Sequence, residues 1–528
     1  MNNISSSILP TQTLVATYTV GSEFVGSWPS YYTFVFAVLL LSVAHWSMKP
    51  STRLCGLDLF PHYQVPKWKW VFGSEGLLKE SYEKFRDHAY QIHGPDGVQV
   101  LLPSRYINEA KLLSDHFLDT EVEQYQTLQT KYTGFPVESD KRQTVINTLR
   151  THIAPAKIAS VSLDLKPELD HLVSNEFPPC NDWTRFKFQP FCLRAIARMS
   201  GYIFVGPSVS RQEEWIDISI NFAMYVFVAG AKLQLFPNWM RPLGQYGVSE
   251  LAKIRRCVST AERILEPVVE EKQLQSLTPG AATPSSEKTL LDAIVDDLPE
   301  EIKWDSRLHA QLQLSASAAS VHPTSQILCE CMYDLAARPE LQEELRQEAH
   351  EILEAGHGWA KKDSASKMRK MDSFMREVQR FRGNMATFLR RVMKPITFAD
   401  GMHLPAGTSI LCPQVGISLD ERFHSYADVF DPMRFYRMRE EAQDQQEGNR
   451  WQFTSPSDFN MHFGIGRHTC PGRFLASTNI KLVLAYFLLN YDVRFRPGAE
   501  RPKSWTIVMT KSPDPSAELE FKRRVPLD

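Results

Sequence analysis

The chain has 528 residues, of which 43% are hydrophobic, so it is long enough to bury a large core. Its 59 Lys and Arg residues nearly balance its 61 Asp and Glu residues, and we therefore expect no nucleic-acid partner. The eight cysteines lack the spacing of a disulfide framework, which favours a reducing compartment.

The first feature along the chain is an uncharged, apolar run over residues 28–46. As a helix it would span roughly 28 Å, close to the hydrocarbon thickness of a bilayer. Aromatic residues flank both ends, and basic residues follow the run while none precedes it. The positive-inside rule then predicts a single-pass anchor with the rest of the chain in the cytosol. A cleaved signal peptide is the alternative, but the basic segment that should open one is missing.

The sequence predicts four segments, one of which is the anchor. They are a lumenal tail (1–27), a transmembrane anchor (28–47), a linker on the membrane surface (48–70) and a catalytic domain (71–528). Residues 66–70 alternate Lys and Trp after a proline, which suits a stiff, amphipathic connection at the membrane surface. The sequon at Asn3 would be open to glycosylation in the lumen.

The catalytic segment is predicted to be mainly α with a small β region. Residues 75–89 have apolar positions at helical spacing, and residues 98–103 indicate a short strand. Residues 397–411 predict a turn and a strand pair. Two segments rich in small or polar residues, 276–287 and 440–449, predict exposed loops inside one domain.

A long helix is predicted over residues 304–337, and its centre carries an unusual proline, Pro323. Pro323 has no N–H to donate to the carbonyl of Ala319, so we expect a kink there and a carbonyl that could hold water. His322 can carry a proton near neutral pH and Thr324 offers a hydroxyl, which makes both candidates for a proton relay. The alternative is that His322 only caps or packs.

Further along, Glu377 and Arg380 lie three residues apart in a helical pattern, so they share a helix face and can pair. Such a pair alone is usually a solvated surface pair that adds little stability. Arg434, in the run Phe-Asp-Pro-Met-Arg-Phe, is a second arginine that could join the carboxylate.

The loop from Phe463 to Gly472 is the most informative motif in the chain. Gly464, Gly466 and Gly472 remove side chains where a backbone must turn sharply or approach a flat macrocycle. Cys470 precedes a helical run, and a helix N-terminus stabilises a thiolate. A thiolate presented in this way suits haem iron. A buried structural cysteine or half of a disulfide is the alternative.

With this loop, the chain resembles the haem-thiolate monooxygenases of the cytochrome P450 superfamily. The family signature Phe-x-x-Gly-x-x-x-Cys-x-Gly matches at every position. The resemblance implies the cytochrome P450 fold and a haem b cofactor, with Cys470 as the axial iron ligand and with Phe463 and the loop glycines beside the haem.

The same resemblance implies roles for other residues. Glu377, Arg380 and Arg434 would form a buried, structural charge triad, and His468 and Arg390 would bind the haem propionates.

Some positions depart from the family pattern or allow two assignments. Arg467 and Arg391 each adjoin a predicted propionate ligand and could exchange with it by one register step. The tryptophan signature of an earlier helix is not visible around residues 144–150, so we assign no haem contact there. His322 takes the place of the family's acid and Pro323 that of its first threonine, which puts the usual proton relay in doubt.

Phrases at 367–374, 430–436 and 462–474 look like those of fungal, membrane-bound enzymes of secondary metabolism, similar to ent-kaurene-oxidase-like and indole-diterpene enzymes. The resemblance implies insertion of oxygen from O2 into a hydrophobic secondary metabolite, with a terpenoid or meroterpenoid as the leading substrate. A polyketide or alkaloid is the runner-up. Desaturation, isomerisation or dehydration is an alternative reaction, and a haem-binding sensor without turnover is an alternative class.

Electrons should come from a partner, because no nicotinamide or flavin motif follows a strand in this chain. The resemblance implies NADPH-cytochrome P450 reductase, with cytochrome b5 as a further donor. It also implies residence in the endoplasmic reticulum membrane, in contact with lipid.

Overall fold

The computed structural model describes residues 60–63, 73–94, 97–135, 139–277, 288–356, 358–361, 363–507 and 509–524. The chain divides into two compact units, Met1–Lys49 and Pro50–Asp528, and every described residue belongs to the second. The predicted anchor at 28–47, the predicted surface segment at 66–70 and most of the predicted loop at 276–287 lie outside the described residues.

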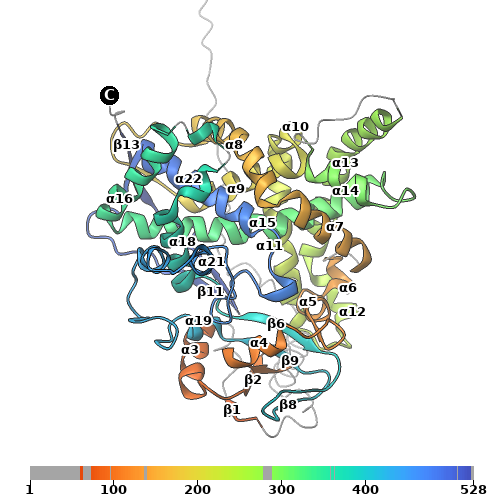
Figure 1. Ribbon diagram of the computed structural model, residues 1–528. Helices are drawn as coiled ribbons and strands as arrows, with labels where there is room; N and C mark the ends of the chain where they lie inside the picture. The colour runs from red at the N-terminus through yellow and green to blue at the C-terminus, as the bar shows by residue number, and fades with distance from the viewer. Residues whose placement is uncertain are drawn as a thin grey trace, which may run out of the picture. The chain divides into compact units, whose positions relative to one another are not determined.

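Helices make up most of the described part, so the prediction of a mainly α fold is confirmed (Figure 1). The longer helices are α3 (Ser74–Lys84), α7 (Ser139–His152), α8 (Pro155–Glu176), α9 (Phe188–Val205), α11 (Glu213–Gln234), α13 (Ser249–Ser276), α14 (Leu290–Asp297), α15 (Ser306–Ala336), α16 (Pro339–Ala349), α18 (Arg369–Arg382) and α22 (Arg473–Asn490). The shorter ones are α4 (Ile107–Ala110), α5 (Thr120–Thr127), α6 (Thr130–Thr133), α10 (Pro207–Ser210), α12 (Arg241–Gly244), α17 (Ser364–Lys367), α19 (Gln414–Ile417), α20 (Arg434–Glu440) and α21 (Gln445–Asn449). Single turns are η2 (Ser104–Tyr106), η3 (Gln245–Gly247), η4 (His350–Glu354), η5 (Gly358–Ala360) and η6 (Gly466–His468).

The strands form small sheets, as expected for a small β region. The largest sheet has the order β1-β2-β3-β9-β6-β4, and the others are β10-β13-β5, β11-β12 and β7-β8. Their bounds are β1 (His62–Tyr63), β2 (Tyr90–Gly94), β3 (Gly97–Leu101), β4 (Leu118–Asp119), β5 (Thr184–Phe186), β6 (Thr387–Val392), β7 (Ile396–Thr397), β8 (His403–Leu404), β9 (Ser409–Cys412), β10 (Tyr491–Arg494), β11 (Trp505–Ile507), β12 (Thr510–Ser512) and β13 (Leu519–Arg523).

Most local predictions agree with these elements. The predicted strand at 98–103 corresponds to β3, and the predicted turn and strand pair at 397–411 lies within β7, β8 and β9. The loop predicted at 440–449 was wrong in part, because α21 occupies its second half. The carboxylate of Asp444 starts this helix by accepting a hydrogen bond from the N–H of Glu447 at 2.8 Å.

Helix α15 runs through the middle of the helical layer in Figure 1 and packs against α9, α11, α13, α18 and α22. The carboxylate of Asp305 begins it by accepting from the N–H groups of Arg307 and Leu308. Its 31 residues make a rod about 46 Å long. The helix continues through Pro323, so the proline does not end it; the predicted kink stays a prediction.

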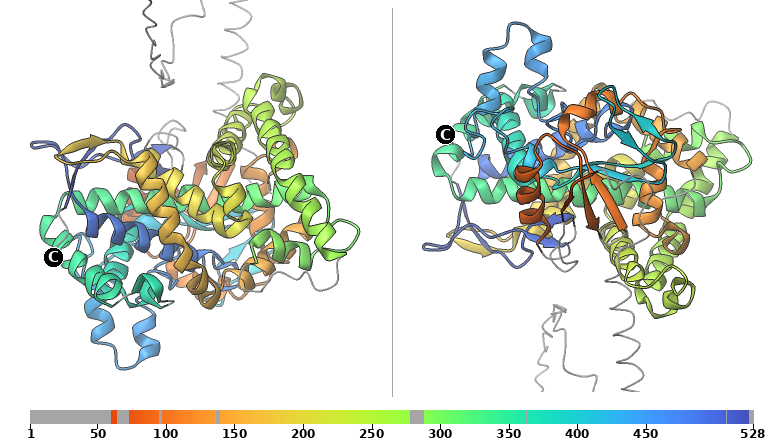
Figure 2. Two further views of the ribbon diagram at one scale, coloured as in Figure 1. Left: turned by 90° about the horizontal axis from the view of Figure 1, so that it is seen from above. Right: turned by 90° about the horizontal axis from the view of Figure 1, so that it is seen from below.

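The six-stranded sheet joins distant parts of the chain. β3 pairs in parallel with β9, so that Val100 lies opposite Ile410, and β9 pairs antiparallel with β6. Seen from below, the orange N-terminal strands lie beside the cyan strands from the last third of the chain (Figure 2). This pairing fixes the position of β6, which carries two of the arginines considered above.

Among the described helices, α11 is long and apolar enough to cross a membrane. Half of its most apolar window is buried, and it packs against α9, α13 and α15. These contacts are those of a core helix.

Candidate functional site

The loop before α22 folds back on itself as its glycines suggest. The N–H of Cys470 donates to the carbonyl of Phe463 at 2.7 Å, which closes the loop. Gly464 has a φ of +70°, and a Cβ there would lie 2.5 Å from the carbonyl oxygen of His468. Gly466 also has a positive φ, +65°. Only glycine fits this path without strain. The ring of Phe463 packs edge-on against that of Phe453.

The sulfur of Cys470 lies at the start of α22. Burial raises the pKa of the Cys470 thiol, and hydrogen bonds from the backbone N–H groups of Gly472 and Arg473 oppose that rise. The Arg473 side chain, which donates to the Cys470 carbonyl at 2.8 Å, adds positive charge nearby. A metal ion bound to a thiol deprotonates it outright. The N–H groups would then stabilise the thiolate.

Cys470 is also the cysteine best placed for a ligand role. Of the seven cysteines in the described part of the chain, six are fully buried and only Cys470 is half-buried. A buried thiol away from any opening is chemically inert. The one described cysteine that is not fully buried is therefore the one in the glycine-rich loop.

Helix α15 faces this loop with small side chains. Ala319 and Pro323, four residues apart on one face, are exposed although the helix is buried along most of its length. Pro323 and Ile327 share a cavity of about 60 Å³ with Phe463 of the loop and Ala476 of α22. The exposed stripe of α15 and the cysteine loop thus border one internal site.

The predicted propionate ligands lie at one side of this site. Arg390 is buried and donates to the carbonyl of Leu389 at 2.8 Å, but it forms no ion pair with any residue that the structure describes. Burial lowers the pKa of Arg390 to about 10, so the guanidinium is still charged at neutral pH. The Nε2 atom of His468 lies 2.6 Å from a carboxylate oxygen of Asp115.

The structure distinguishes each predicted propionate ligand from the arginine next to it in the sequence. Arg391 points to the other side of β6, where it pairs with the carboxylate of Glu123 at 2.6 Å. Arg467 lies 4.0 Å from Asp115. Arg150, for which sequence analysis assigned no contact, donates to the carbonyl of Arg467 at 2.7 Å. No pattern in the sequence marked Arg150 beforehand.

The two candidate relay residues lie in different surroundings. The ring of His322 points toward α11, where its Nε2 lies 2.7 Å from the carbonyl oxygen of Ile220. Burial lowers the pKa of His322 below its ordinary value, so the ring is neutral and donates this bond. Thr324 is buried and lines the cavity shared with Phe463. The structure brings Thr324 to the site and turns His322 away from it.

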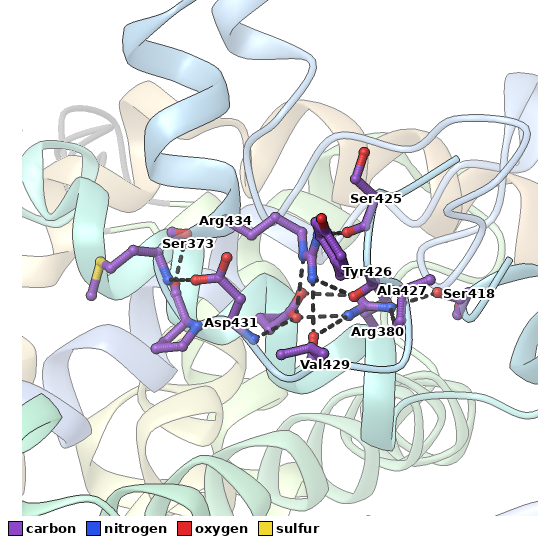
Figure 3. Close-up of polar contacts among 12 residues, drawn as sticks. Ser373, Arg380, Ser418, Ser425, Tyr426, Ala427, Val429, Asp431 and Arg434 are labelled. Atoms are coloured by element: carbon purple, nitrogen blue, oxygen red, sulfur yellow. Dashed lines mark hydrogen bonds and ion pairs between the residues drawn. The ribbon is translucent and has the colours of Figure 1, made fainter. Parts of the chain in front are cut away.

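Arg380 and Arg434 lie close together in a buried cluster (Figure 3), and the buried carboxylate of Glu377 pairs with both. Two nitrogens of Arg380 donate to the two carboxylate oxygens of Glu377, at 2.7 and 2.9 Å, and the Nε of Arg434 lies 3.4 Å from the same carboxylate. The arginines also donate to backbone carbonyls of the segment before α20, namely those of Ser418, Ser425, Tyr426, Ala427 and Val429. The cluster thereby holds the chain that leads to the cysteine loop.

The residues present fit an anionic, iron-bearing macrocycle. The sulfur of the half-buried Cys470, with two backbone N–H donors, would ligate the iron of such a group. Arg390 supplies a buried cation whose carboxylate partner is missing from the described residues, as expected for a site that takes carboxylate side arms. Helix α15 contributes the exposed side chains of Ala319 and Pro323. Together these features define a haem-thiolate site.

Comparison with known proteins agrees with this class. The sequence model of cytochrome P450 matches residues 92–519. The chain is 32% identical to the cytochrome P450 monooxygenase braC of Annulohypoxylon truncatum, over 94% of this chain and 98% of that one. It is 32% identical to the cytochrome P450 monooxygenase AN1598 of Emericella nidulans, over 88% and 87%, and 31% identical to olcJ of Penicillium canescens, over 87% and 86%.

The chain therefore belongs to the cytochrome P450 family, and it is a monooxygenase of that family. Its cofactor is haem, which supplies the iron that binds and activates oxygen.

Proposed function

We propose that this enzyme inserts one oxygen atom of O2 into a hydrophobic secondary metabolite, with a terpenoid or meroterpenoid as the leading substrate class. The observation that carries the proposal is the half-buried Cys470, whose sulfur accepts hydrogen bonds from two backbone N–H groups in a loop that shares a cavity with Pro323 of α15. The substrate class rests on the resemblance at 367–374, 430–436 and 462–474 to ent-kaurene-oxidase-like enzymes.

Electrons for this reaction come from NADPH through a separate reductase, with cytochrome b5 as a further donor. A hollow of about 420 Å³ lies beside the cysteine loop and is lined in part by Arg150, Arg467 and Arg473. Such a cationic surface favours fast association with an acidic protein partner. We expect exchange of Arg150 and Arg467 for Glu to slow electron transfer from the reductase, most strongly at low salt.

The enzyme resides in the endoplasmic reticulum membrane, anchored by residues 28–47 with its catalytic part in the cytosol. An exposed apolar segment after α11 supports a second contact with lipid: Trp239 and Tyr246 are 73% and 86% exposed. Tryptophan and tyrosine concentrate where a bilayer meets water. Deletion of residues 1–50 should weaken membrane association and leave haem binding intact. Exchange of Trp239 for Ser in the truncated protein should further reduce binding to phospholipid vesicles.

The ligand assignment is tested by spectroscopy. The reduced enzyme under carbon monoxide should show the red-shifted Soret band of thiolate ligation, and Cys470→Ser should abolish that band. Cys412→Ser, which changes a fully buried cysteine outside the loop, should retain it. A Cys470→Ser enzyme that kept the band would overturn the assignment.

The reaction is tested with candidate terpenoids, NADPH, reductase and isotopically labelled O2. Label in the product supports insertion of oxygen, whereas product formation without NADPH contradicts it. The proline at position 323 favours a second candidate, a desaturase, isomerase or dehydratase that needs less proton delivery. An unlabelled product would support that candidate. Oxygen uptake without any oxidised product would support a haem-binding sensor.

A further inference from the structure

A basic patch on the first half of α13 has no role in the reaction proposed above. Arg255, Arg256 and Arg263 line a surface hollow of about 620 Å³, together with the hydroxyl residues Ser259 and Thr260. Arg255 and Arg263 each lie four residues from Ser259, and Arg256 lies three residues from it, so these side chains share one face of the helix. In Figure 1, α13 lies at the edge of the helical layer.

Two of the three arginines have no acidic partner. Arg255 and Arg256 are exposed and form no ion pair with any residue that the structure describes, whereas Arg263 pairs with Glu214 of α11. The side chains of that pair are 62% and 55% exposed, so the pair contributes little stability and opens readily. A guanidinium presents parallel N–H groups that match the oxygens of a phosphate. The hollow therefore suits a ligand that carries an anionic phosphate group.

The charge of α13 changes sign along the helix. Its exposed charged side chains are basic as far as Arg263, whereas those of Glu266, Glu270 and Glu271 in the second half are acidic. A negatively charged surface attracts the first half and repels the second. An extended anionic partner therefore meets α13 near its start and leaves its far end in water.

An exposed apolar segment lies next to the basic half. Between α11 and α13, four large apolar side chains are more than two-thirds exposed, namely Leu235, Trp239, Leu243 and Tyr246. Helix α13 begins at Ser249, and Arg256 follows seven residues later, about 10 Å along the helix axis. An interfacial segment sinks its apolar face about 5–10 Å into the boundary between lipid headgroups and acyl chains. The arginines therefore lie within reach of the headgroups when the apolar segment contacts a bilayer.

We propose that the hollow on α13 binds the phosphate group of an anionic phospholipid in the cytosolic leaflet, through Arg255, Arg256 and Arg263. The inference rests on the membrane contact proposed above for the segment before α13, and it names the kind of lipid that this contact selects. The cytosolic leaflet carries anionic lipids, and each arginine near such a surface strengthens binding by about fivefold. The lipid phosphate competes with the carboxylate of Glu214 for Arg263.

The test uses the full, haem-loaded chain in nanodiscs of phosphatidylcholine that contain a small share of a photoreactive lipid. This lipid is either phosphatidic acid or phosphatidylcholine, with the photoreactive group close to the headgroup in both. Mass spectrometry then counts cross-links to residues 249–264 and to residues 235–247. We expect phosphatidic acid to label residues 249–264 at least about tenfold more than phosphatidylcholine does, because two unpaired arginines contribute about fivefold each. Both lipids should label residues 235–247.

Variants assign the preference to the arginines. Arg255→Gln with Arg256→Gln changes only exposed positions, so this double variant should keep the thiolate band, and its preference for phosphatidic acid at residues 249–264 should fall close to one. Lysine at both positions keeps the charge but loses the parallel N–H groups, and should retain part of the preference. Arg496→Gln is the control. It changes an exposed arginine beyond β10 that forms no ion pair in the described part of the chain, and the preference should stay unchanged.

Inorganic phosphate distinguishes a lipid site from a site for the free ion. Labelling of residues 249–264 by phosphatidic acid should be the same in phosphate buffer as in chloride of equal ionic strength. If phosphate abolished this labelling and chloride did not, the hollow would be a site for free phosphate, and the lipid assignment would be wrong.

The two labelled segments separate this inference from the membrane contact on which it rests. If both lipids label residues 235–247 but residues 249–264 show no preference, the arginine site is wrong and the membrane contact stands. If neither lipid labels residues 235–247, the proposed contact itself fails. An unchanged preference in the Arg255→Gln and Arg256→Gln double variant would also overturn the site.

Discussion

The imidazole of His322 hydrogen-bonds to the backbone carbonyl of Ile220, with 2.7 Å between Nε2 and the oxygen. The bond joins α15 to α11 at the level of Pro323. Around it, Val321 and Ile216 pack in a small, fully buried cluster. His322 thus fastens two long helices together at the point where a proline removes one hydrogen bond from the first of them.

We expect His322→Ala to destabilise the haem-loaded enzyme by about 1 kcal/mol, because it removes one hydrogen bond to the part-buried carbonyl of Ile220. The share of NADPH electrons lost as peroxide should stay at the wild-type value. Chemical unfolding and a peroxide assay measure the two effects. His322→Gln, which can still donate a hydrogen bond, should recover part of the stability. If His322→Ala instead raised the share of peroxide at unchanged stability, His322 would act as a proton relay.

Gly464 and Gly498 form a matched pair, since both have positive φ values. A Cβ at Gly464 meets the His468 carbonyl at 2.5 Å, whereas a Cβ at Gly498 meets nothing within 4 Å. Gly498→Ala should cost only the backbone strain, about 1 kcal/mol. Gly464→Ala should cost more and reduce the haem content of the purified protein. Equal haem content in the two variants would show that the loop tolerates a different path.

Removal of one arginine from the cluster around Glu377 should be severe. In Arg434→Ala the buried carboxylate of Glu377 keeps Arg380 and the N–H of Asp431, and the carbonyls of Ser425, Tyr426 and Val429 each lose one hydrogen bond. We expect a loss of about 3–5 kcal/mol in the free energy of unfolding. Arg437→Ala, which breaks a partly exposed ion pair with Asp431, should cost less than about 1 kcal/mol. Similar losses in both variants would contradict the assigned role.

The enzyme should lose stability in mild acid. Burial lowers the pKa of both His424 and His462 to about 3, so these rings stay neutral in the folded state while the unfolded chain binds protons below about pH 6.5. Stability is therefore full above pH 6.5 and falls as the pH drops toward 3. At pH 5 each ring accounts for a loss of about 2 kcal/mol.

Unfolding curves at pH 7 and pH 5 measure this effect. His424→Gln should reduce the difference in the free energy of unfolding between pH 7 and pH 5 by about 2 kcal/mol, the contribution of one histidine. His171→Gln, which changes an exposed histidine on α8, should leave the difference as it is. An unchanged difference in His424→Gln would show that another group titrates.

Local patterns were enough to predict the helical class, the strand near residue 100 and the glycine-rich turn around Cys470. These depend on residue spacing and on backbone freedom, which a sequence displays directly. The sequence alone could not decide which of Arg390 and Arg391 faces the predicted haem site. It depends on the pairing of β6 with β9, whose register shifts between Thr387 and Arg390. One such shift exchanges the side chains that face the core.

The sequence alone was also not enough to predict the surroundings of the relay candidate His322. A histidine in the middle of a helix has one ring and many possible partners, and its actual partner, Ile220, lies 102 positions earlier in the chain. The orientation of His462 could not be predicted either, because it depends on the packing of Gly383 and on the bond from Asn384.

The pairing of β3 with β9 also constrains how the chain is made. The hairpin of β2 and β3 leaves the ribosome early, while β9 emerges only after most of the helices have been synthesised. Until then the edge of β3 carries unpaired backbone groups and the apolar side chains of Val100 and Leu101, which lie on opposite faces of the strand and are both fully buried in the finished protein. A nascent chain in this state is prone to aggregate. Slow translation or chaperone binding during this interval should therefore govern the yield of the enzyme more than the stability of the completed domain.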